Sequence, residues 1–135
     1  MKGVPERTIT VVAILAIAAM SLAARASATA GPLDGKTFVV QTGEQGKPAE
    51  AKDTLVFRDG KMRSTACDAY GFGDGAYTSM SHPGMFMVHA RTESAKEGVI
   101  VWNCTVRGDA LDGTYVWTKP GQKDITYWIK GTLKK

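Results

Sequence analysis

The chain has 135 residues, 17 basic and 13 acidic side chains, and a formal net charge of +4. Half of that excess lies in the first 30 residues, where Lys2, Arg7 and Arg25 outnumber Glu6, which leaves 14 basic and 12 acidic residues in the remainder. The remaining basic residues are interspersed with acids and form no stripe that would attract a phosphate backbone, so we expect no nucleic acid among the partners.

Residues 1–30 have the pattern of an export signal. A basic start is followed by an apolar run from Ile9 to Ala24 and then by small residues up to Ala30. This order predicts cleavage after Ala28 or after Ala30. The alternative is a retained membrane anchor, but about 16 apolar residues fall short of the roughly 20 that a spanning helix needs. We therefore expect a periplasmic or secreted protein with no stable membrane span after cleavage.

Residues 31–135 are enough for one domain with a single modest core. Apolar and polar residues alternate in eight segments, which is typical of strands with one buried face, and no segment has a convincing helical period. We predict strands over residues 35–42, 53–58, 61–67, 75–82, 85–93, 98–107, 110–118 and 124–133.

Short turns join several of these strands. Asp59-Gly60 and Gly108-Asp109 are typical two-residue hairpin turns, and Pro83-Gly84 marks a third reversal. Eight antiparallel strands with one apolar face are most simply satisfied by an all-β, up-and-down barrel, because closure removes exposed edges. The face assigned to the core contains Phe38, Val40, Leu55, Phe57, Met62, Phe86, Val88, Ala90, Ile100, Trp102, Val106, Leu111, Tyr115, Trp117, Tyr127, Ile129 and Leu133.

The up-and-down order sorts the connections by length. All three tight turns fall at one end of the predicted barrel, and the long connections over residues 43–52, 68–74, 94–97 and 119–123 fall at the other. Loops carry function more often than tight turns do. The long-loop end is therefore the predicted mouth of any pocket.

Several segments suggest a family. Residues 90–94, 98–102, 105–109, 112–114 and 127–133, together with Trp117, resemble small exported bacterial proteins of lipocalin-like (calycin-like) shape, most of them functionally uncharacterised. The first strand runs Gly35-Lys36-Thr37-Phe38, without the Trp that lipocalins have two residues after the Gly. The resemblance thus implies the barrel shape over nearly the whole mature chain rather than the deep pocket of that family.

The connection over residues 68–74 is rich in Gly and contains Tyr70 and Phe72. These two aromatic residues are either a lid that contacts a ligand or a cover folded over the end of the core. With Trp102, Tyr115 and Trp117 as a wall, they are the candidate binding residues for a small apolar or lipid-like molecule.

Methionine and histidine gather around the third turn. A two-residue turn there would place His82 opposite Met85 and Met80 opposite Met87, with His89 on the same face. Thioether and imidazole groups suit copper, so a copper-binding periplasmic module is one alternative function. The other interpretation is that Met fills gaps between apolar groups and His89 is an ordinary surface residue.

Cys67 and Cys104 are the only cysteines. Export would favour a disulfide, but the predicted strands place the two residues at different heights and three strands apart, so a bridge is possible but not favoured.

No nucleophile with an adjacent base, carboxylate pair or open metal position is visible in the sequence. We therefore expect a non-catalytic protein without a cofactor. Besides ligand binding, a structural or interaction protein with a filled core remains an alternative, and the sequence leaves the oligomeric state open.

Overall fold

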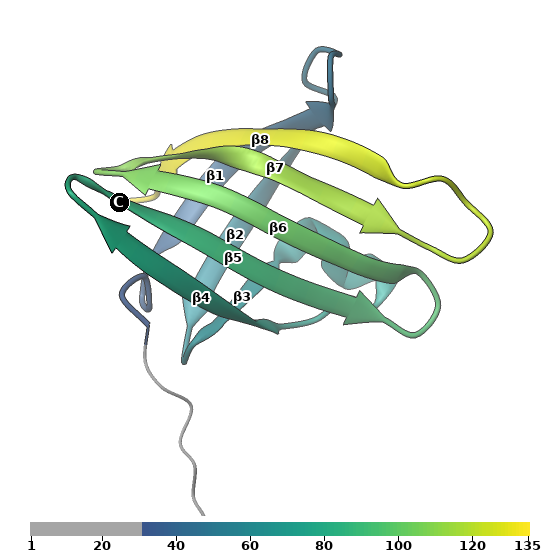
Figure 1. Cartoon of the computed structure of the whole chain (residues 1–135), viewed down its shortest axis with the longest axis horizontal. Helices are drawn as coiled ribbons and strands as arrows, with labels where there is room; N and C mark the ends of the chain where they lie inside the picture. Colours follow the sequence, from purple (N-terminus) through teal and green to yellow (C-terminus); the bar gives the residue numbers. More distant parts are fainter. Residues whose placement is uncertain (1–30) are drawn as a thin grey trace, which may run out of the picture.

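A computed structural model describes residues 31–135, so the predicted export signal over residues 1–30 lies outside the described residues. Eight strands pair in sequence order to form a closed antiparallel barrel (Figure 1). They are β1 (Thr37–Glu44), β2 (Ala51–Arg58), β3 (Lys61–Ser64), β4 (Gly75–His82), β5 (Met85–Ser94), β6 (Gly98–Arg107), β7 (Ala110–Thr118) and β8 (Ile125–Leu133), and the 3-10 helix η2 (Thr65–Tyr70) lies between β3 and β4. The predicted all-β barrel is confirmed.

The hairpin turns set the register of the strands. Phe57 lies opposite Met62 across the β2–β3 turn, as the two-residue loop predicts. Asp59 and Gly60 both have positive φ, 53° and 74°, which this kind of turn requires. The tight turns and the long β5–β6 and β7–β8 loops lie at opposite ends of the barrel (Figure 1). None of the helices among residues 31–135 is long and apolar enough to cross a membrane.

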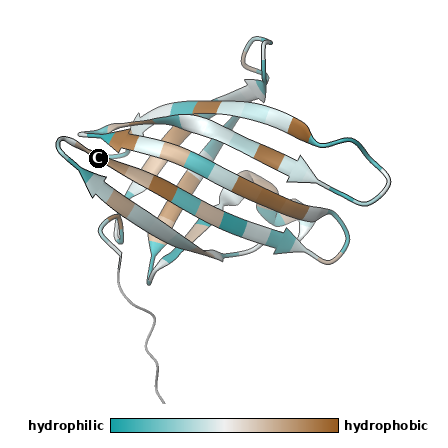
Figure 2. Cartoon of the chain, viewed as in Figure 1, coloured by the Kyte–Doolittle hydropathy of each residue, from teal (hydrophilic) through white to brown (hydrophobic). Residues whose placement is uncertain are grey.

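Apolar side chains from alternate strand positions fill the barrel. Figure 2 shows apolar and polar residues interspersed along the strands, whereas the β7–β8 loop is mostly hydrophilic. Most of the predicted core positions are buried, and Phe38, Leu55 and Leu111 have no exposed surface. Four further hydrophobic residues, Leu33, Phe72, Tyr77 and Cys104, are buried although the predicted core face did not include them.

The third strand is shorter than predicted, and a short 3-10 helix that the sequence pattern did not indicate follows it. β3 ends at Ser64, and residues 65–70 form η2 instead of extending the strand to residue 67. The cause is the carboxylate of Asp53 on β2, which accepts hydrogen bonds from the Ser64 hydroxyl and the Ala66 N–H and so turns the chain out of the sheet. Gly71 ends η2 with a φ of 83°, a left-handed conformation that favours glycine.

The segment before β1 closes the tight-turn end of the barrel. Two backbone bonds, Asp34 N–H to Gly31 O and Lys36 N–H to Leu33 O, fold this segment into a turn. Leu33 is completely buried and belongs to the same apolar cluster as Phe38 and Phe57. This end of the barrel is therefore plugged by a side chain.

The carboxylate of Asp34 spans the weakest seam of the barrel. β3 and β4 pair only through Lys61 with Ala76 and Met62 with Gly75. Beside this short ladder, Asp34 accepts hydrogen bonds from the Gly60 N–H at 3.0 Å and from the Tyr77 hydroxyl at 2.8 Å. Burial pushes the pKa of Asp34 upward, but the hydrogen bonds from Tyr77, Gly60 and Gly31 outweigh it and leave the pKa below its usual value.

Removal of the Tyr77 hydroxyl should weaken this closure. The hydroxyl also accepts the buried N–H of Leu33 at 3.1 Å, so Tyr77→Phe leaves that donor without a partner. We expect the free energy of unfolding to fall by about 1–3 kcal/mol. Urea denaturation measures the change, and Tyr70→Phe, at a side chain that is 62% exposed, is the matched control. Equal stabilities of the two variants would contradict the role given to Tyr77.

Candidate functional site: an aromatic pocket at the long-loop end

A pocket of about 480 Å³ opens at the predicted mouth of the barrel. Four of the five candidate binding residues line it, namely Tyr70, Phe72, Tyr115 and Trp117, and Tyr127 completes its aromatic wall. Ile100 and Ala51 add apolar surface, and Cys67 of η2 adds a thiol. We call this site the aromatic pocket.

A stack of rings on three neighbouring strands forms one wall. Trp102, Tyr115 and Tyr127 lie opposite one another on β6, β7 and β8. The centroids of Trp102 and Tyr115 are 4.4 Å apart, and those of Tyr115 and Tyr127 are 4.8 Å apart. Trp102 is fully buried, donates its Nε1–H to Thr92 Oγ1 and does not itself line the pocket. Trp102 therefore packs against the Tyr115 ring and supports the wall without contacting the pocket.

Hydrogen bonds fix the orientation of the wall. Thr42 Oγ1 donates its single proton to the Trp128 carbonyl at 2.8 Å, so the Tyr115 hydroxyl is the donor in its 2.9 Å contact with Thr42. Burial raises the pKa of Tyr115 to about 12, which keeps this donor protonated at neutral pH. Trp117 is held in the same way, because its Nε1–H donates to the Glu97 carbonyl at 2.6 Å.

The two aromatic residues after β3 fit both interpretations offered by the sequence. Phe72 is 4% exposed and packs with the core, as a cover would. Tyr70 is 62% exposed at the edge of the pocket, where a lid would lie. The segment is tied to β5 because the Ser94 hydroxyl donates to the Tyr70 carbonyl at 2.7 Å.

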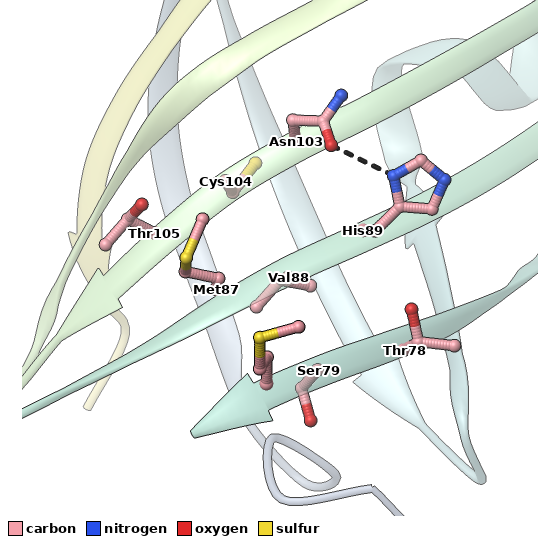
Figure 3. Close-up of a pocket in the computed structure, with 9 residues that line it drawn as sticks. Thr78, Ser79, Met87, Val88, His89, Asn103, Cys104 and Thr105 are labelled. Atoms are coloured by element: carbon pink, nitrogen blue, oxygen red, sulfur yellow. Dashed lines mark hydrogen bonds between the residues drawn. The ribbon is translucent and has the colours of Figure 1, made fainter. Parts of the chain in front are cut away.

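The methionine and histidine residues lie elsewhere, on the outer face of β4 and β5. Their register is as predicted, with Met80 opposite Met87 and His82 opposite Met85. Met80, Met87 and His89 line a separate hollow of about 410 Å³. In Figure 3 the His89 ring points toward Asn103, to which its Nδ1 is hydrogen-bonded at 2.9 Å, and away from Met87. Among residues 31–135 no group of three or more His, Cys, Asp and Glu side chains is arranged to hold a metal ion.

The two cysteines are not bonded to each other. Cys104 faces the core from β6 and is buried, whereas Cys67 is half-buried on η2 rather than on a strand. Burial raises the pKa of the Cys104 thiol to about 12 and also raises that of Cys67.

Some pocket residues were not among the candidates from the sequence. Tyr127 was assigned to the core face but not to the site, although alternation along the last strand places it beside Tyr115. Thr42, Glu50 and Glu97 carry no motif. The pairing of β1 with β8, which closes the barrel, brings Thr42 and Glu50 to the aromatic wall, whereas Glu97 reaches it through the pairing of β6 with β7.

Comparisons with protein-family models, with curated proteins and with solved structures find no match for this chain. The class that the fold defines is thus a closed eight-stranded antiparallel barrel with a pocket at one end.

The two thiols should differ in reactivity. Only the thiolate is alkylated, so at about pH 8 iodoacetamide should modify Cys67 slowly and Cys104 hardly at all, with the Cys67 rate rising as the pH is raised toward its elevated pKa. Peptide mass spectrometry measures both rates, and in urea both residues should react alike. Equal labelling in the native protein, or no labelling until a reductant is added, would contradict the structure.

Proposed function

We propose that the protein is an exported, non-catalytic barrel that binds a small, partly apolar molecule in the aromatic pocket. The observation that carries this proposal is the convergence of Tyr115, Trp117 and Tyr127 on a single pocket at the long-loop end. Its volume of about 480 Å³ falls within the roughly 300–1,000 Å³ typical of small-molecule sites.

The distribution of packing supports a ligand at this end. The tight-turn end is filled by Leu33, Phe38 and Leu111, none of which has exposed surface. The aromatic wall at the other end remains partly exposed, although its residues belong to the same inner face. A partly apolar molecule would cover this surface and gain the free energy of its removal from water.

The chemistry of the pocket suits binding rather than catalysis. Burial raises the pKa values of the Tyr115 and Tyr127 hydroxyls and of the Cys67 thiol. All three groups are therefore held in their protonated, weakly nucleophilic forms at neutral pH.

The barrel shape also fits the resemblance to small exported lipocalin-like proteins of bacteria. With the signal pattern of residues 1–30, it supports a periplasmic or secreted location, where a barrel of this kind would sequester or carry its ligand.

Two tryptophan substitutions on β2 test the proposal. Ala51 lines the pocket, whereas the neighbouring Lys52 is exposed and, by strand alternation, points to the other face. Ala51→Trp should fill the mouth and weaken binding of the neutral probe N-phenyl-1-naphthylamine at least about tenfold, whereas Lys52→Trp should bind like the wild type. Probe fluorescence gives the affinities, and circular dichroism verifies the fold.

Saturable binding by the wild type that Ala51→Trp weakens and Lys52→Trp leaves unchanged is the expected result. Failure of the wild type to bind this probe and a broad panel of apolar molecules would contradict the proposal and favour a structural or interaction protein. Equal binding by both variants would place the ligand elsewhere.

A further inference from the structure

We infer that the ligand of the aromatic pocket is an organic cation, a protonated amine or quaternary ammonium group on an apolar body. This inference rests on the proposed function and adds the charge of the ligand to it. It arises from the way carboxylates and aromatic faces are combined around the pocket.

The charged residues that line the pocket are both acidic, Glu50 and Glu97. Glu97 Oε2 is neutralised by Lys119 Nζ at 2.9 Å. Glu50, in contrast, has no cationic side chain within ion-pair distance among the described residues. The unneutralised charge at the pocket wall is therefore negative.

The free carboxylate and an aromatic ring line the same pocket, Glu50 and Tyr127. Tyr115 stacks on one face of the Tyr127 ring, with an angle of 15° between the rings, so a ligand cannot contact that face. Burial, followed by the charges of Glu50 and Glu44, raises the pKa of Tyr127, in keeping with carboxylates near this ring. Glu44 is already paired with Lys47 at 3.2 Å, so Glu50 is the group that remains for a ligand.

A second carboxylate acts on the wall. Asp53 is 8% exposed, and its carboxylate accepts hydrogen bonds from Ser64, Ala66 and Thr54. Its charge contributes, after burial, to the raised pKa of Tyr115. Acidic side chains thus act on both Tyr115 and Tyr127.

These features together favour a positively charged ligand. A cation over an aromatic face is attracted by the negative face of the ring, and a nearby carboxylate strengthens the attraction. An anionic ligand such as a fatty acid would bring its carboxylate toward Glu50. The pocket therefore favours a cationic head with an apolar tail over a neutral or anionic molecule of equal length.

Three probes of equal chain length separate the charge from the apolar contact. Octyltrimethylammonium, 1-octanol and octanoate compete with N-phenyl-1-naphthylamine for the pocket, and the displacement curves give their affinities. We expect the ammonium probe to bind about tenfold more tightly than 1-octanol, octanoate to bind most weakly, and added salt to reduce the difference.

Two charge-removing variants localise the effect. Glu50→Gln should weaken binding of the ammonium probe about threefold to fivefold and leave 1-octanol unchanged. Asp59→Asn removes the same charge from the exposed turn at the other end of the barrel and should change neither affinity.

The outcomes distinguish the inference from the proposed function. If all three probes bind equally, or octanoate binds best, the pocket binds apolar molecules but the inference of a cationic ligand is wrong. If Glu50→Gln and Asp59→Asn have the same effect, the preference is a general charge effect and the assignment to Glu50 is wrong. If no probe and no other apolar molecule binds, the proposed function itself fails.

Discussion

The carboxylate of Asp34 is the contact on which the closure of the barrel depends. Seven neighbouring strand pairs share four or more residue pairs each, but β3 and β4 share only two. Asp34 joins the two sides of this seam through the Gly60 N–H and the Tyr77 hydroxyl. The same turn inserts Leu33 into the core, so a single short segment both closes the seam and plugs one end.

The asymmetry of the barrel follows from that plug. Leu33 fills the tight-turn end and has no exposed surface, whereas Tyr115 and Trp117 at the long-loop end remain partly exposed. There, η2 takes the place of a longer third strand and brings Cys67, Tyr70 and Phe72 to the pocket. One carboxylate, Asp53, causes this change by turning the chain after Ser64. Closure and site therefore each depend on one acidic side chain, Asp34 before β1 and the buried Asp53 on β2.

Alternation and turn residues were sufficient to predict the long strands from β4 to β8. β5 and β6 bury alternate residues, and turn residues mark the start of β4, where only Tyr77 is buried. Alternation failed after Ser64, where bonds to the distant Asp53 override the local pattern, and it could not include Leu33, which precedes the first strand. For the site, sorting the connections by length placed Tyr115 and Trp117 at the mouth. Glu50 could not be found in this way, since only the closed barrel brings it near Tyr127.

The role of Asp34 is tested most directly by amide hydrogen exchange, resolved by residue. Asp34→Ala removes the carboxylate that accepts from the Gly60 N–H and the Tyr77 hydroxyl at the seam, whereas Asp109→Ala at the same end removes only an exposed ion pair with Lys135. The account predicts faster exchange at Gly60 and along β3 and β4 in Asp34→Ala alone, with β6 to β8 unchanged. Equal acceleration in all strands, or the same pattern in both variants, would contradict it.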